Sequence, residues 1–241
     1  MERYRNLWLW MLIPVAIMQA GIFHDYWGDF SQNAWSVHVH YWAATLWYLF
    51  LVMQPYFATH GQMAKHRTNG IIGMFLAGGV AMTALSMVHR DMASAEKAVE
   101  FPERFGPFEP WFFHGVIVVE FVMMSAFAVA VVQAIRHRRS LHDHAWWLVS
   151  TVFIIMFPAL GRGLQTALTT WYGFNHAAMM KASYLSIAII VAMALLAAWK
   201  FGRLGHPATA LAVGVNLSCL LIEPIGKSPW VQEALKALIR D

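Results

Sequence analysis

Histidine is unusually frequent in this sequence, which has 12 histidines against 13 aspartates and glutamates. Four of them, His40, His66, His114 and His144, each lie near the start of one of four consecutive apolar segments. In an antiparallel helical bundle, such positions alternate between the two membrane faces. Two imidazoles on facing helices are the axial ligands that a six-coordinate b-type haem needs. The spacing therefore predicts a pair near each face, His40 with His114 and His66 with His144.

Further polar residues fall within or beside the apolar segments, where they need partners. Arg162 on one side and Arg67 on the other are placed to neutralise haem propionates. Gln54 shares a helical stripe with His40, since fourteen residues return to nearly the same face. The other candidate polar core residues are Glu120, Gln165, Asn216 and Glu223. Arg162 with Glu120 also has a structural interpretation, as an ion pair in the outer half of the bilayer.

The composition places these residues in a membrane protein. Of the 241 residues, 59% are hydrophobic and only 12% are charged, whereas soluble domains have about 25% charged residues. This excludes disorder, most soluble enzymes and nucleic acid as a partner. The single cysteine excludes an internal disulfide framework.

Seven apolar segments are long enough to cross a bilayer as helices. The sequence predicts an all-α bundle forming one integral membrane domain over residues 1–241, in the inner (plasma) membrane. Its spans are 7–23, 35–57, 71–88, 111–135, 146–168, 183–199 and 208–222. Residues 90–110 form an outer loop with a short helix over 92–99, and the tail 229–241 reads as an amphipathic surface helix.

The distribution of basic residues predicts the orientation through the positive-inside rule. With the amino terminus in the cytoplasm and seven spans, the carboxyl terminus lies outside. The net charge of +4 then divides into a basic inner rim and a mildly acidic outer one. The basic residues of the inner rim are Arg3, Arg5, Lys65, Arg67, Arg136, Arg138, Arg139, Lys200 and Arg203.

Several motifs resemble an uncharacterised bacterial family of multi-span membrane proteins. They are Gln54-Pro55, the run from His66 to Gly70, the run from His142 to Trp147 followed by Arg162, and Asn216-Leu217 followed by Glu223. The likeness covers most of spans two to seven, and it implies a membrane bundle without implying an activity.

More loosely, the alternating histidines are similar to the di-haem transmembrane cytochromes b of the ascorbate and ferric-reductase group. That resemblance implies haem ligation by His40 with His114 and by His66 with His144, and electron transfer across the membrane. The chain departs from the pattern because His66 and His144 stand just ahead of their apolar segments, beside charged residues. If a single haem is bound, we therefore expect it between His40 and His114.

Three functions stay open at this point. The first is b-haem electron transfer, with one or two haems; the protein is an oxidoreductase only if a quinone or another small redox partner binds at one face. The second is a non-redox membrane protein, namely a transporter, a sensor or an assembly subunit, in which Glu120, Arg162, Gln165 and Asn216 line a polar path. The third is a metal site at the outer face, built from histidines and carboxylates. A homo-oligomer or a subunit of a larger membrane complex fits any of these.

Overall fold

The structure is a computed structural model, and it describes residues 4–239 of the chain. Within that range it contains only helices and connecting turns, which confirms the all-α prediction. The helices are α1 (Leu7–Gly21), α2 (Trp35–Thr59), α3 (Met63–Ser86), α4 (Val88–Glu100), α5 (Pro102–Phe105), α6 (Pro110–Arg136), α7 (Leu141–Ile154), α8 (Phe157–Tyr172), α9 (His176–Phe201), α10 (Pro207–Ser218), α11 (Ile222–Gly226) and α12 (Pro229–Ile239). A π-helical turn over Phe23–Gly28 and two 3-10 turns, Phe30–Gln32 and Cys219–Leu221, complete the regular structure.

Five stretches of helix are long and apolar enough to cross a membrane, which indicates a multi-pass membrane protein. They are Met63–Glu100, Pro110–Arg136, Leu141–Tyr172, His176–Phe201 and Pro207–Gly226. The other two predicted spans correspond to α1, which has only 15 residues, and α2. Helix α2 has 25 residues, but histidine, glutamine and tyrosine side chains dilute its apolar character.

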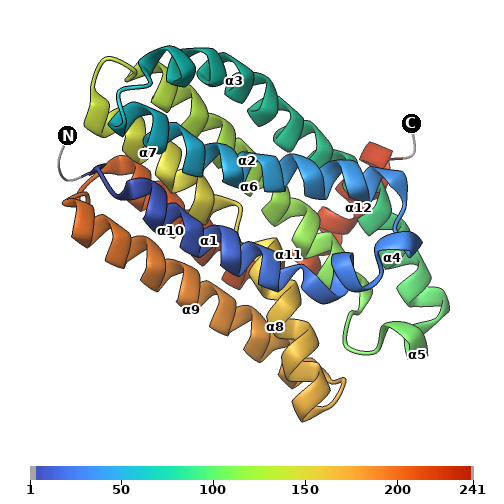
Figure 1. The fold of residues 1–241 in the computed structure, drawn as a ribbon. Helices are drawn as coiled ribbons and strands as arrows, with labels where there is room; N and C mark the ends of the chain where they lie inside the picture. Colours follow the sequence, from blue (N-terminus) through green and yellow to red (C-terminus); the bar gives the residue numbers. More distant parts are fainter. Residues whose placement is uncertain (1–3, 240–241) are drawn as a thin grey trace.

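The helices pack side by side in one elongated bundle (Figure 1). Helix α6 contacts α3, α4, α7, α10 and α11, while α2 packs between α1 and α3. The turns before α3, α7 and α10 gather at one end, and α4, α5 and α12 lie at the opposite end (Figure 1). We call the first the basic end, because Arg67, Arg138, Lys200 and Arg203 lie there. We call the second the acidic end, after Asp25, Asp91, Glu96 and Glu103.

Glycines allow several of these helices to approach closely. A Cβ on Gly163 of α8 would collide with the backbone of Gly21 in α1, and a Cβ on Gly115 of α6 would collide with the Ile222 carbonyl. Small residues at such crossings let membrane helices gain van der Waals contact that lipid cannot replace. Helix α3 also packs through small residues, because Ala77 and Ala84 lie on one face of it and are both buried.

The fifth predicted span is broken in its middle, where α7 ends at Ile154 and α8 begins at Phe157. Pro158 in the first turn of α8 has no N–H, so it cannot donate the helical hydrogen bond to the Ile154 carbonyl. Side chains from other helices bond the carbonyls next to the break. The Tyr48 hydroxyl donates to the Val152 carbonyl at 3.0 Å, and Asn216 Nδ2 donates to the Phe153 carbonyl at 2.9 Å. Tyr48 and Asn216 are both almost fully buried, so their side chains supply the hydrogen bonds that water would give these carbonyls at the protein surface.

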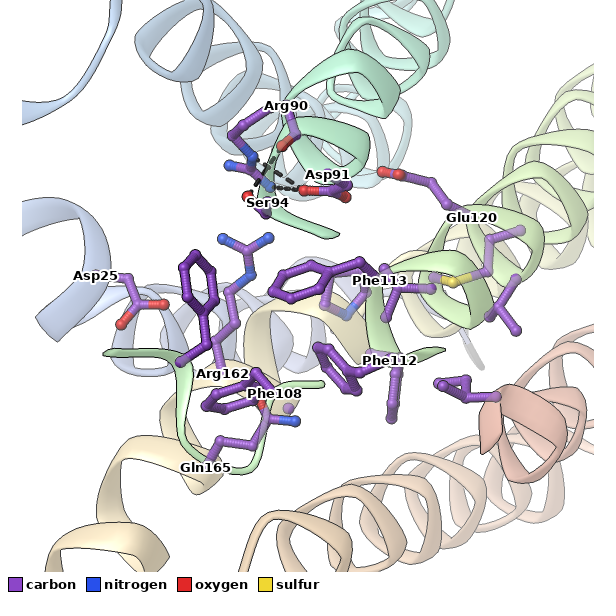
Figure 2. A pocket seen from close by; sticks show the side chains of 18 of the residues that line it. Asp25, Arg90, Asp91, Ser94, Phe108, Phe112, Phe113, Glu120, Arg162 and Gln165 are labelled. Atoms are coloured by element: carbon purple, nitrogen blue, oxygen red, sulfur yellow. Dashed lines mark hydrogen bonds and ion pairs between the residues drawn. The ribbon is translucent and has the colours of Figure 1, made fainter. Parts of the chain in front are cut away.

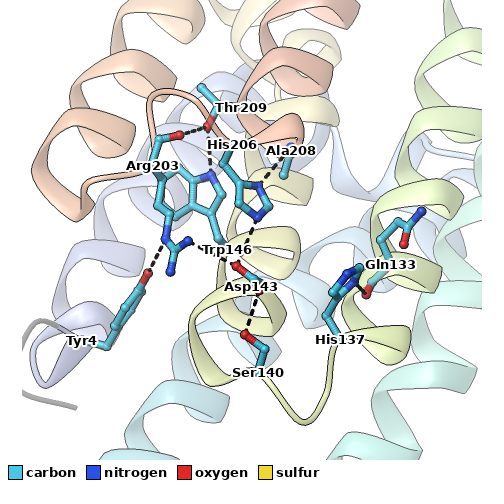
Figure 3. Close-up of polar contacts among 10 residues, drawn as sticks. All are labelled: Tyr4, Gln133, His137, Ser140, Asp143, Trp146, Arg203, His206, Ala208 and Thr209. Carbon is cyan, nitrogen blue, oxygen red and sulfur yellow. Dashed lines mark hydrogen bonds and ion pairs between the residues drawn. The ribbon is translucent and has the colours of Figure 1, made fainter.

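A polar network closes the basic end (Figure 3). Asp143, at the start of α7, accepts from Arg203 at 3.2 Å and lies 3.5 Å from Nε2 of His206. Arg203 also donates to the Tyr4 hydroxyl at 3.3 Å. The network therefore ties the amino-terminal segment and the α9–α10 turn to the first turn of α7.

The segments at the acidic end are folded against the bundle. The predicted outer loop 90–110 contains α4 and α5, and α4 packs on α6. Helix α12 covers most of the predicted tail, and its Leu235 is buried against Val88, Met92 and Ile117. Residues 240 and 241 of that tail lie outside the described residues.

We expect Asn216→Leu to lower the stability of the bundle by about 1–3 kcal/mol, because the Phe153 carbonyl is left unpaired in an apolar interior. Thermal unfolding in detergent measures this change. Ser218→Ala is the matched control, since the Ser218 hydroxyl bonds only to the Val215 carbonyl of its own helix. Equal melting temperatures for the two variants would contradict a role for Asn216 at the break.

We expect acid to weaken the network at the basic end through His206. Burial and the neighbouring Arg203 hold the pKa of His206 below its ordinary value of 6.5, although Asp143 opposes this. As the pH falls, the unfolded chain therefore takes up this proton before the folded protein does. The contribution of His206 is complete above about pH 6.5 and is lost as the pH falls through the folded-state pKa.

Melting temperatures between pH 8 and pH 5 test this: His206→Gln should lose less stability over that range than the wild type. His60→Gln, which replaces an exposed histidine at the same end, should keep the wild-type pH dependence. A His206→Gln curve parallel to the wild-type curve would refute the assignment.

Candidate functional site

A cavity of 480 Å³ lies at the basic end, with walls from α2, α3, α6 and α7. His66 of α3 and His144 of α7 both line it, and their ring centroids are 6.2 Å apart with the ring planes at 86°. A smaller hollow of 70 Å³ on the α1 side shares both histidines. We call the larger space the histidine cavity. The structure thus brings together one of the two pairs that the sequence predicted.

The two rings of this pair differ in their hydrogen bonding. Nδ1 of His144 lies 2.8 Å from the carbonyl oxygen of Ala134, to which it donates as the N–H tautomer. Nδ1 of His66 is buried and has no hydrogen-bond partner. A carbonyl that fixes one imidazole nitrogen is the usual support for metal ligation by the other.

The separation of the rings also suits a shared metal. Imidazole nitrogens bind metals at about 2 Å, so rings on opposite sides of one ion have centroids about 6 Å apart. Perpendicular ring planes are compatible with that arrangement, because each nitrogen bonds along its own ring plane. The separation of the centroids is therefore compatible with two imidazoles that would hold one metal ion between them.

The walls of the histidine cavity are mostly apolar, with charge at its rim. Trp47 and Phe50 form part of the wall, and nothing lies within 4 Å in front of Gly70. Arg67 and Arg138 line the same space, so two guanidinium groups are available for a carboxylate-bearing ligand. The sequence places Arg138 only in the basic rim, although its position about one helical turn beyond the end of span four is a signal that it can reach the site.

Gln54 lies where α2 meets this site. Its side chain is 4% exposed, lines the cavity, and leaves Nε2 without a partner. The sequence placed Gln54 on one stripe with His40, whereas in the structure it belongs with His66 and His144. An unpartnered buried amide is uncommon in folded proteins and often marks a binding site.

A second cavity, of 380 Å³, lies toward the acidic end (Figure 2). We call it the phenylalanine cavity, because its walls include Phe105, Phe108, Phe112, Phe113, Phe157 and Phe174. Arg162 extends into it from α8, and within the described residues its one hydrogen bond runs from Nη1 to the Tyr41 hydroxyl at 3.0 Å. Glu120 of α6 also lines it, and its Oε2 has no partner.

Arg162 and Glu120 face the same cavity without forming a direct ion pair. Within the described residues, the one ion pair on this wall joins Arg90 to Asp91 at 2.9 Å. Gln165 is buried beside Arg162 and donates to the Ser183 hydroxyl at 3.4 Å. Arg162, Glu120 and Gln165 thus share one site, as a polar path would require, but Asn216 does not, because it bonds to the Phe153 carbonyl.

The outer histidine pair is not brought together. His40 lines a narrow extension of 70 Å³ beside the phenylalanine cavity, with Arg162 and Glu120, and its Nδ1 lies 3.4 Å from the Thr83 hydroxyl. His114 is buried on another face of α6, near Lys236 of α12, and its Nδ1 has no partner. Among residues 4–239 no ring contact joins the two histidines. His114 lies near α12, which packs on α6, so the two histidines have different neighbours.

Glu223 lies at the surface near the acidic end rather than in the core. Its carboxylate accepts from Lys227 Nζ at 2.6 Å, one turn along the chain. We find no group of three or more histidine, cysteine or acidic side chains able to hold a metal ion within the described part of the chain. The predicted metal site at the outer face therefore has no geometric support.

Comparison with known proteins adds no family to this description. No family model matches the chain, and neither a curated protein nor a solved structure matches it.

We expect Gly73→Ala and Gly70→Ala to have opposite effects. A Cβ on Gly73 would overlap the Phe50 ring, so we expect a loss of about 1–3 kcal/mol from overpacking. A Cβ on Gly70 meets open space, and there alanine should add about 0.5–1 kcal/mol through its higher helix propensity. Thermal unfolding of the two variants measures the difference. Destabilisation by Gly70→Ala would contradict the open wall of the histidine cavity.

Proposed function

We propose that this protein is a seven-span electron-transfer protein of the plasma membrane that holds one b-type haem between His66 and His144. The observation that carries the proposal is the facing of these two imidazoles across an apolar cavity, with ring centroids 6.2 Å apart. Haem supplies reversible one-electron chemistry at its iron. The proposal differs from the sequence-based expectation for a single haem, which favoured His40 and His114.

The residues around the pair have the roles that such a cofactor requires. The Ala134 carbonyl holds the His144 ring in one orientation through Nδ1. Trp47 and Phe50 exclude water from one wall, and Gly70 leaves room for a flat ring. Arg67 and Arg138 line the same cavity and would supply cations for the haem propionates. These residues support the proposal of a bis-imidazole site.

The membrane topology belongs to the same proposal. Helices α1 and α2 complete the seven spans, since they pack in the bundle beside α3 and α8. Arg67, Arg138, Lys200 and Arg203 at one end then put that end, and the amino terminus, in the cytoplasm under the positive-inside rule. The haem would lie near the cytoplasmic face, and a quinone or another small redox partner would exchange electrons with it.

A non-redox function is the second candidate, and one observation favours it. The break between α7 and α8 lies beside a cavity lined by Arg162 and Glu120. Interrupted helices next to buried charges occur at the substrate sites of transporters. Purified protein that binds no haem would leave this candidate as the better one.

The reduced-minus-oxidised absorbance spectrum of purified protein, produced with added haem precursor, tests the main proposal. We expect sharp α and Soret bands in the wild type, and their loss in His66→Ala and in His144→Ala, because either change would remove one of the two imidazoles that would hold the haem iron. His137→Ala is the matched control at the same end; its Nδ1 bonds to the Gln133 carbonyl of the preceding turn. This variant should keep the wild-type spectrum.

The outer pair provides the discriminating variants. His40→Ala and His114→Ala should leave the bands unchanged if the haem lies at the histidine cavity. Loss of the bands in these variants, together with their retention in His66→Ala, would contradict the proposed site and assign the haem to His40 and His114. A wild-type protein without bands, even after haemin is added, would refute haem binding altogether.

A further inference from the structure

The phenylalanine cavity has the size and lining of a small-molecule site. Its 380 Å³ falls within the range of about 300–1,000 Å³ that is usual for ligand pockets. Phe108, Phe112 and Phe113 form a continuous aromatic surface, with neighbouring ring centroids 5.1 and 5.6 Å apart. Phe105 and Phe174 extend it on either side. Such a surface favours a flat aromatic ring over an aliphatic ligand.

The polar end of the cavity offers one strong donor and one strong acceptor that are both incompletely used. The Arg162 guanidinium has five N–H donors, of which only one is recorded in a hydrogen bond, to Tyr41. Glu120 Oε2 has no partner. Both side chains point into the space between α4 and the phenylalanine rings (Figure 2). A ligand that accepts from a guanidinium and donates to a carboxylate would satisfy both groups.

The charge of the lining favours a neutral ligand. Three arginines, Arg90, Arg104 and Arg162, stand against three carboxylates, Asp25, Asp91 and Glu120. An anion entering the cavity would be repelled by the carboxylates, and a cation by the guanidinium groups. A neutral molecule with polar oxygens meets neither penalty.

We propose that the phenylalanine cavity binds a quinone or quinol headgroup, with its ring against the phenylalanines and its oxygens at Arg162 and Glu120. A quinone carbonyl accepts from the Arg162 guanidinium, and a quinol hydroxyl donates to the Glu120 carboxylate. This binding depends neither on haem nor on the histidine cavity, which lies at the opposite end of the bundle, and the experiment below separates the two sites.

Equilibrium dialysis of the purified full-length protein with decylubiquinone, a short-chain quinone, tests the proposal. We expect saturable binding of one equivalent, weakened about tenfold in Arg162→Gln, because this variant removes a charged hydrogen-bond donor. We also expect Phe112→Leu to weaken binding several-fold. Phe121→Leu is its matched control, because Phe121 is a partly exposed phenylalanine of the same helix that does not line the cavity.

The outcomes are decisive even if Arg162→Gln fails to fold, because the comparison of Phe112→Leu with Phe121→Leu remains. Equal affinities for these two variants, or the absence of saturable binding to the wild type, would overturn the proposal. Tighter binding of 4-hydroxybenzoate, an anionic ring, than of decylubiquinone would also overturn it. We expect His66→Ala to lose the haem bands and to keep the wild-type affinity for quinone, because the two binding sites are independent.

Discussion

The absence of water is the constraint on which this structure depends. Inside a bilayer, each backbone N–H and C=O must be paired within the protein, and a continuous helix achieves this without help. The helix is interrupted at Ile155 and Met156, in the middle of a predicted span. Tyr48 from α2 and Asn216 from α10 then donate to the carbonyls beside the gap. Two helices far apart in sequence are therefore held against α7 by the same bonds that make the break possible.

The break between α7 and α8 lets one predicted span contribute to two cavities at different positions along the bundle. Helix α7 carries His144 to the basic end, and α8, starting anew at Phe157, directs Arg162 into the phenylalanine cavity. One predicted span thus contributes to two cavities, one with paired imidazoles and one with a balanced set of charges. Their chemistry differs because charged side chains lie only at the rim of the first cavity, whereas six charged side chains line the second.

The sequence predicted the helical class and the juxtaposition of His66 with His144, because apolar length and positions at span ends are local properties. It did not predict that His40 and His114 would face different neighbours. Their helical faces depend on which helices flank α2 and α6, and the covering of α6 by α12 arises from the three-dimensional packing of Leu235. Gln54 illustrates the same limit. Its angle relative to His40 follows from sequence, but its proximity to His66 requires the α2–α3 packing.

The network at the basic end has a consequence for the order of assembly. His144 directly follows Asp143, which Arg203 holds from a distance of 60 residues along the chain, and Arg203 in turn reaches Tyr4 across 199 residues. The first turn of α7 therefore has one contact that the chain can make only once the α9–α10 turn has been synthesised, in addition to the local bonds from Ser140 to Asp143 and from His144 to the Ala134 carbonyl. A nascent chain that ends before the α9–α10 turn already contains both histidines of the pair and all four helices that line the histidine cavity, but it lacks the Arg203–Asp143 ion pair.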